Sequence, residues 1–168
     1  MQRVLVIGIP GAGKSTFSLA LAGRTDLPVI HLDKEFWRPG WVPTPRSEWR
    51  AKVVALAAGD SWIMDGNYDS SLDLRLPRAD TVVWFDYPMF PCLRRAIWRA
   101  VSSYGRVRPD MGEGCGERFD PEFLRYIWTF HAKERPSVVA SLARFGGHIQ
   151  PVVFRRDDDA ARFLAALS

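Results

Sequence analysis

The residues most able to do chemistry in this sequence stand together near its start. A glycine-rich run ends in a lysine and two hydroxyl side chains: Gly8, Ile9, Pro10, Gly11, Ala12, Gly13, Lys14, Ser15 and Thr16. A short apolar run, 4–7, precedes it, and a good helix-forming run, 17–22, follows it. The backbone N–H groups of such a strand–loop–helix unit converge on a polyphosphate. The spacing therefore predicts an ATP-binding loop in which Lys14 contacts the β- and γ-phosphates and Ser15 binds Mg²⁺.

The glycines of this loop have a predicted backbone role. Gly8, Gly11 and Gly13 are expected to adopt positive φ angles and to let the backbone approach the phosphates without an intervening Cβ. A simple turn between a strand and a helix would need glycines, but it would not need Lys14 and Ser15 at these positions. Nucleotide binding is therefore the favoured interpretation.

Composition sets limits on the other possibilities. The 168 residues are 47% hydrophobic and 25% charged, which predicts one globular domain spanning 1–168. We see no apolar window long enough to span a membrane and no secretion signal, and the two cysteines, Cys92 and Cys115, do not make a disulfide framework. A cytoplasmic location is therefore expected. The net charge of +4 fits anionic partners, either phosphorylated compounds or nucleic acid.

The order of elements predicts an α/β fold. Strands are expected near 2–8, 27–32, 62–66, 81–86 and 148–154, separated by helices. This alternation predicts a parallel sheet with helices on both faces. Three prolines and a glycine in the aromatic stretch 36–45 argue against a regular element there, and Pro136 is expected to interrupt a long helix that begins near 120.

Carboxylates follow three of the expected strands. Asp33, Asp65 and Asp86 would all reach the carboxyl edge of the sheet, where ligands bind in such folds. Asp65 and Asp86 are both candidates for the metal carboxylate. Gly66 after Asp65 allows close approach of a ligand, whereas Asp86 is also suited to capping the next helix. Asp33 is a candidate general base if the acceptor is an alcohol, and an orienting group if the acceptor is an already ionised phosphate.

Arginines cluster around a second glycine-rich stretch. Arg95 and Arg99 share one face of an expected helix, and a loop at about 105–120, rich in glycine and arginine, is a candidate mobile lid. Guanidinium groups stabilise charge on a transferring phosphoryl group, so Lys14, Asp33, Arg95 and Arg99 form the predicted catalytic set. The alternative is that the arginines form a solvated helix face.

The aromatic stretch 36–45 also allows two interpretations. Trp37 and Trp41 beside Arg38 are suited to a stacking surface for a base or ring. The same two indoles would equally well pin the loop to the core of the protein.

Several of these motifs together resemble a known family. The phosphate loop, His31-Leu32-Asp33, Asp65-Gly66-Asn67-Tyr68, Arg95-x-x-x-Arg99 and the string 108–115 resemble adenylate-kinase-like proteins of the bacterial "DNA topology modulation protein" subgroup. The resemblance implies a P-loop NTPase three-layer sandwich with five parallel strands in the order 2-3-1-4-5. It also implies a MgATP donor site, Asp65 as the metal carboxylate, an acceptor segment at about 33–75 and a lid at about 105–120.

The acceptor site departs from the family pattern. Adenylate kinases follow the Asp-Gly pair with Phe-Pro-Arg, but this chain has Asn67-Tyr68 instead and its next arginine is Arg75. The predicted substrate-binding residues are Asp33, Arg38, Asp65, Gly66, Asn67, Tyr68 and Arg75. The predicted function is phosphoryl transfer from ATP to a nucleotide or another small molecule. The alternative is a nucleotide switch that affects DNA topology with little turnover. We find no sequence motif for direct nucleic-acid binding.

Overall fold

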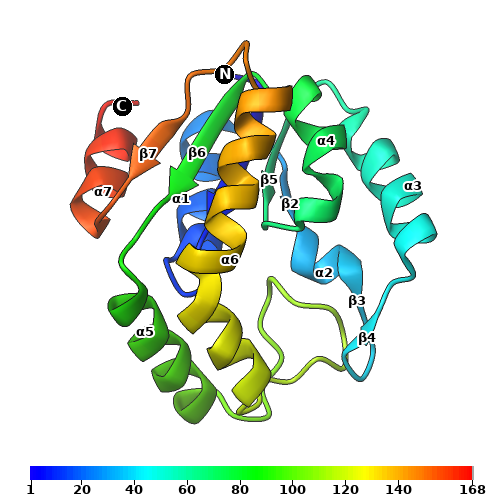
Figure 1. Cartoon of the computed structure of the whole chain (residues 1–168), viewed down its shortest axis with the longest axis vertical. Coiled ribbons are helices and arrows are strands. Elements are labelled where there is room, and N and C mark those ends of the chain that lie inside the picture. Colours follow the sequence, from blue (N-terminus) through cyan, green and yellow to red (C-terminus); the bar gives the residue numbers. More distant parts are fainter. Residues whose placement is uncertain (168) are drawn as a thin grey trace.

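The centre of the protein is a five-stranded parallel sheet in the order β2-β5-β1-β6-β7 (Figure 1). The structure, a computed structural model, describes residues 1–167. The strands are β1 (Arg3–Gly8), β2 (Val29–His31), β5 (Trp62–Asp65), β6 (Thr81–Phe85) and β7 (Val152–Phe154). They correspond to the five expected strands, and their order confirms the predicted 2-3-1-4-5 arrangement.

Helices cover both faces of this sheet. They are α1 (Lys14–Thr25), α2 (Leu32–Phe36), α3 (Arg46–Ala57), α4 (Leu72–Arg75), α5 (Met89–Ser102), α6 (Pro121–Phe145) and α7 (Asp157–Ala165), with 3₁₀ turns at Asp69–Ser71 and Leu76–Arg78. Helices α1 and α7 pack on one face, while α3, α4 and the C-terminal half of α6 pack on the other. Helix α5 packs against the N-terminal half of α6 beyond the carboxyl edge of the strands (Figure 1). No helix within residues 1–167 has the length and apolar character needed to cross a membrane.

Burial on both faces explains why β1 is a continuous apolar run. Val4 and Val6 belong to the core beneath α1 and α7, whereas Leu5 and Ile7 belong to the core beneath α3 and α4. All four side chains are fully buried. An alternating polar pattern would place a polar residue in one of these two cores, which is why a central parallel strand is apolar throughout.

The aromatic stretch 36–45 contains a regular element that its prolines were expected to exclude. Strands β3 (Trp37–Arg38) and β4 (Val42–Pro43) form a short antiparallel hairpin. Gly40 and Trp41, both at positive φ, make its turn. The prediction of no regular structure was wrong because a two-residue strand accepts proline at its edge, where the missing N–H is not needed.

Helix α6 runs through Pro136 without a break, contrary to expectation. Its start was predicted correctly: Asp120 accepts hydrogen bonds from the backbone N–H groups of Glu122 and Phe123, which is an N-cap. A proline inside a helix costs about 3 kcal/mol. Buried side chains on both sides of it, Phe130 and Val138, hold the two halves against the two cores and offset that cost.

Candidate active site

The phosphate loop joins the end of β1 to the start of α1. No side chain caps α1 and its first turn carries no acidic residue, so its backbone N–H groups face the loop without a side-chain acceptor. The ammonium Nζ of Lys14 donates to the backbone oxygens of Gly8 at 2.8 Å and Ile9 at 3.1 Å. The lysine thus lies folded over the loop, close to where phosphate groups would bind.

The three glycines have the predicted positive φ angles, but for different reasons. A Cβ on Gly8 would stand 2.2 Å from the backbone oxygen of Phe85, and one on Gly11 would stand 2.4 Å from that of Cys92. These two glycines are required by neighbouring protein rather than by phosphates. A Cβ on Gly13 would meet nothing within 4 Å, so only this glycine faces open space.

Strand pairing places Asp65 at the site. Val6 of β1 and His31 of β2 are both in register with Asp65 of β5, so all three lie at one edge of the sheet. Nδ1 of His31 lies 3.0 Å and 3.1 Å from the two carboxylate oxygens of Asp65. This hydrogen bond is the main reason that the pKa of His31 is raised above its usual value. The sequence analysis did not name a partner for His31. The pairing of β2 with β5, which places their ends side by side, would have indicated Asp65.

Asp33 lies in the first turn of α2, one residue past the expected strand end. The hydroxyl of Tyr68 donates to Oδ1 of Asp33 at 2.6 Å. Burial raises the pKa of Asp33, while the hydrogen bond from Tyr68 and the charge of Lys14 oppose that rise. Burial of its ammonium group lowers the pKa of Lys14, and the negative charges of Asp33 and Asp65 oppose this effect. The charge of Lys14 and those of the two carboxylates, Asp33 and Asp65, therefore act on one another.

The segment after Asp65 connects the acceptor side to the phosphate loop. Oδ1 of Asn67 accepts a hydrogen bond from the backbone N–H of Gly8 at 2.7 Å. Gly66 has a φ of +128°, and a Cβ there would stand 2.9 Å from Cβ of Leu32. Gly66 and Asn67, predicted as substrate-binding residues, are thus engaged with the protein itself, and they fix the position of this segment.

Arg75 does not reach the site surface. It was predicted to bind the acceptor, yet its side chain is fully buried. It donates to the backbone oxygens of Gly66 at 3.0 Å, Tyr68 at 3.2 Å and Ser71 at 3.4 Å, and to that of Asn67. Burial lowers its pKa to about 10, which still leaves the guanidinium charged at neutral pH. The arginine holds the 66–71 segment in place, so direct substrate contact by Arg75 is not supported.

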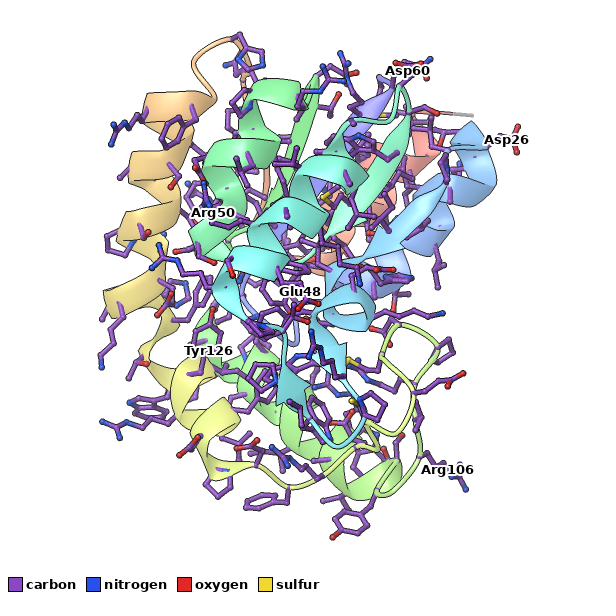
Figure 2. The ribbon with its side chains drawn as sticks, turned by 90° about the vertical axis from the view of Figure 1, so that its right-hand side faces the viewer. Asp26, Glu48, Arg50, Asp60, Arg106 and Tyr126 are labelled. Carbon is purple, nitrogen blue, oxygen red and sulfur yellow. The ribbon has the colours of Figure 1, made fainter. Side chains whose placement is uncertain are left out.

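Arg38 is also engaged elsewhere. Its guanidinium pairs with the carboxylate of Glu48 at 2.5 Å, and both side chains are exposed. Glu48 belongs to α3 (Figure 2). A substrate would have to displace this ion pair to use Arg38.

The two arginines predicted to act together separate in the structure. Arg95 forms a bidentate ion pair with Asp157 at the start of α7. Arg99 instead faces the lid loop, residues 105–120, where Nε lies 3.3 Å from Oε1 of Glu117. The charge of Arg99 acts on Lys14, which places Arg99 on the nucleotide side. Of the predicted pair, only Arg99 joins the group around Lys14, because α7 supplies an acceptor that directs Arg95 away.

Buried acids of the lid loop are functional candidates that the sequence did not reveal. Glu117 and Asp110 are each 8% exposed. Nε of Arg108 lies 3.1 Å from Glu117, and its NH1 nitrogen lies 3.2 Å from Asp110. Glu117 thus bridges Arg99 and Arg108. Arg106, by contrast, points outward from the loop (Figure 2).

The lid loop is packed over the β3–β4 hairpin. Trp41 donates its indole N–H to the backbone oxygen of Gly116 at 3.1 Å, and the backbone N–H of Gly40 donates to the oxygen of Gly114 at 3.2 Å. Trp37 and Trp41 contact each other edge to face, with ring centroids 5.5 Å apart. The geometry favours a structural role for these two tryptophans over a stacking surface. They hold the lid loop in place.

Asp86 is a structural residue, although it is not a helix cap. Arg135 of α6 donates to its two oxygens at 2.8 Å and 2.9 Å. The N-cap of α5 is Pro88, without a side-chain hydrogen bond. Asp86 is therefore committed to α6, which leaves Asp65 as the carboxylate beside the phosphate loop.

The donors near the loop suit a magnesium ion. Mg²⁺ prefers oxygen ligands and usually keeps several waters, with one or two protein ligands and the phosphates. Ser15 in the first turn of α1 and Asp65 at the end of β5 supply such oxygens, so they would hold the ion. No cluster of three or more His, Cys, Asp or Glu side chains suited to a metal occurs in residues 1–167, so a site built from protein ligands alone is not found there.

Comparison with known proteins agrees on the fold. No family model matches the sequence, and no curated protein matches it. Among solved structures, the chain is similar to the 1.7 Å crystal structure of a shikimate kinase from Bacteroides thetaiotaomicron. The TM-score is 0.54 and the identity 17%, over 99% of this chain and 98% of that chain. At this identity the likeness concerns the fold alone. The chain therefore has the α/β fold of a P-loop kinase, with a five-stranded parallel sheet between helices.

Proposed function

We propose that this protein is an ATP-dependent kinase that transfers the γ-phosphoryl group of ATP to a small-molecule acceptor. The observation that carries the proposal is the convergence of Lys14, Asp33 and Asp65 at one edge of the sheet, beside an uncapped helix N-terminus. A binding site for nucleotide alone would need the loop and the lysine. It would not need a second carboxylate, Asp33, on the acceptor side.

Each residue of the candidate site has a defined role in this reaction. The N–H groups at the start of α1 and the ammonium of Lys14 bind the phosphates. Ser15 and Asp65 would hold Mg²⁺, which neutralises charge on the phosphate oxygens when it is bound. Arg99 pairs with Glu117 of the lid loop, and it stabilises charge on the transferring group once Glu117 releases it. Asp33 lies where an acceptor group would approach.

The test is ADP formation from MgATP with separate pools of nucleoside monophosphates, nucleosides, sugars and polyol acids. Wild type is compared with Lys14→Ala and with Lys133→Ala, a control at an exposed lysine of α6. We expect turnover that depends on one pool, is lost in Lys14→Ala and is unchanged in Lys133→Ala. Tight ATP binding without turnover in any pool would overturn the kinase proposal and favour a nucleotide switch.

A further inference from the structure

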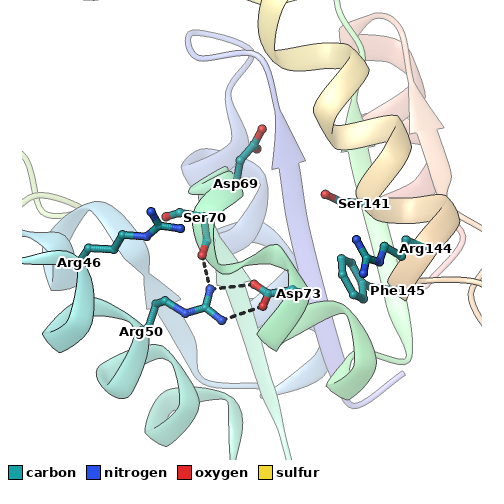
Figure 3. A pocket seen from close by; sticks show the side chains of 8 residues that line it. All are labelled: Arg46, Arg50, Asp69, Ser70, Asp73, Ser141, Arg144 and Phe145. Atoms are coloured by element: carbon teal, nitrogen blue, oxygen red, sulfur yellow. Dashed lines mark hydrogen bonds and ion pairs between the residues drawn. The ribbon is translucent and has the colours of Figure 1, made fainter.

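Three of the four arginines in the acceptor segment 33–75 are bound to other groups of the protein. Arg38 pairs with Glu48, and Arg75 is buried among backbone oxygens. Arg50 forms a bidentate pair with Asp73 at 3.0 Å and 2.7 Å and donates to the backbone oxygen of Ser70 (Figure 3). The exception is Arg46, which is exposed at the start of α3.

Arg46 belongs to a pocket whose lining does not include Asp33. That pocket lies between α3, α4 and the C-terminal half of α6, and it is lined by Arg46, Arg50, Asp69, Ser70, Asp73, Ser141, Arg144 and Phe145 (Figure 3). Helix α6 ends with Arg144 and Phe145 near the edge of the sheet that lies opposite the phosphate loop (Figure 1). Two aspartates, Asp69 and Asp73, stand against the three arginines of the lining. The pocket is therefore not a phosphate clamp for an acceptor at Asp33.

The lid loop brings paired charges as well. Arg108 acts on Asp33 electrostatically, but it arrives with Asp110 and Glu117 as partners. An acceptor phosphate beside Asp33 would face the carboxylates of Asp33 and Asp65, and the lid guanidinium that acts on Asp33, that of Arg108, is already paired with Asp110 and Glu117. Ionised phosphate in such a site is strongly disfavoured because like charges repel and burial removes the water that would stabilise it.

Asp33 itself is held in a defined orientation. Tyr68 donates to Oδ1, and the Tyr68 ring packs against Phe36 and Trp49 with ring centroids 4.8 Å and 5.0 Å away. Tyr68 has a φ of +41°, a conformation that a bulky residue adopts only where its surroundings impose it. The carboxylate is thus held through Oδ1 in an orientation that Tyr68 fixes.

We propose that the acceptor of this kinase is an uncharged small molecule that reacts through a hydroxyl group, with Asp33 as the catalytic base and Tyr68 as a positioning residue for Asp33. The inference rests on the proposed kinase function. In the step, the acceptor oxygen forms a bond to the γ-phosphorus while the bond from that phosphorus to the bridging oxygen of ADP breaks. The hydroxyl proton moves to Asp33, and the products are ADP and a phosphate monoester.

The first experiment compares acceptors that differ in charge. Pairs are adenosine and AMP, glycerol and glycerol 3-phosphate, and shikimate and its methyl ester, each with MgATP. We expect the uncharged member of a used pair to have a kcat/KM at least tenfold higher, with a monoester as product by ³¹P NMR. Formation of a phosphoanhydride, or a preference for the phosphorylated members, would overturn the inference and leave the kinase proposal standing.

The second experiment needs no knowledge of the acceptor, because water can take its place. Asp33→Asn is expected to lower ATP hydrolysis by about 10² to 10⁴, the usual contribution of a general base. Tyr68→Phe is expected to lower kcat about tenfold with the KM for ATP unchanged. Tyr104→Phe, at a tyrosine that is 69% exposed, is the matched control and should behave as wild type. Full hydrolysis by Asp33→Asn would contradict the inference.

The pH profile separates a positioning role from a structural one. The groups that face Asp33 are Lys14, His31, Asp65, Tyr68 and Arg108. The hydrogen bond from Tyr68 lowers the pKa of Asp33, so its loss raises that pKa. The acidic limb of kcat/KM in Tyr68→Phe should therefore move to higher pH, and an unmoved limb would refute positioning by Tyr68. Absence of turnover with every acceptor and with water, despite ATP binding, would overturn the kinase proposal together with this inference.

Discussion

Replacing Arg75 by leucine distinguishes a positioning role from substrate binding. The side chain is fully buried and donates to four backbone oxygens, three of them at 3.0–3.4 Å. Leucine fills much of the volume but leaves these oxygens without their donor. A buried acceptor that loses its partner costs about 1–3 kcal/mol. With about 1 kcal/mol for each of three oxygens, we expect the free energy of unfolding to fall by about 3 kcal/mol.

Urea unfolding followed by tryptophan fluorescence measures this change. Because a domain of this size is stable by only about 5–15 kcal/mol, the loss is easily resolved. The control is Arg78→Leu, which removes hydrogen bonds to the oxygens of Ala57 and Ala58 from an exposed arginine and should cost about 1 kcal/mol or less. A loss below about 1 kcal/mol in Arg75→Leu, with a raised KM for the acceptor, would refute the reasoning and restore Arg75 as a substrate-binding residue.

Three further predictions follow from local geometry. Lys14→Ala should weaken ATP binding by at least tenfold in calorimetric titration while leaving the unfolding midpoint nearly unchanged; equal affinity would contradict the role of the loop. Gly8→Ala should destabilise the fold more than Gly13→Ala in urea, since only the first Cβ meets a backbone oxygen, at 2.2 Å. Asp86→Asn should cost about 1 kcal/mol at pH 7. The ion pair with Arg135 lowers the pKa of Asp86 in the folded protein. The pair therefore stabilises the fold fully above the pKa of Asp86 in the unfolded chain, and this stabilisation is lost as pH falls through the lower pKa of the folded state. A cost of Asp86→Asn that persists at low pH would argue against the pair.

Much of the fold could be predicted because its signals are local. The run 4–7 is apolar because both faces of β1 are covered, and the alternation of strands and helices leaves few possible topologies. The two wrong expectations, no regular element at β3–β4 and a break in α6, have different causes. Pro43 stands at the edge of a short hairpin, where its missing N–H is not needed, whereas packing on both sides of Pro136 offsets a cost of about 3 kcal/mol.

The partners of the charged side chains were the least predictable part of the site. Arg95 and Arg99 share a helix and a spacing, yet one pairs with Asp157 and the other faces Glu117. A long side chain on a surface helix has several rotamers of similar energy, and the nearest acceptor selects among them. That acceptor is supplied by a distant segment, so sequence spacing alone did not identify it.

The sequence by itself determined the conformation of the glycine-rich loop 8–15, because its residues are contiguous and their geometry follows from the strand and helix on either side. Only the tertiary structure decided how the acceptor side is built. Tyr68 meets Asp33 from 35 residues away, and Arg75 turns inward to backbone oxygens rather than outward to a ligand. Directional hydrogen bonds between distant segments exist only after the sheet and its helices have assembled, and they fix where each of these side chains points.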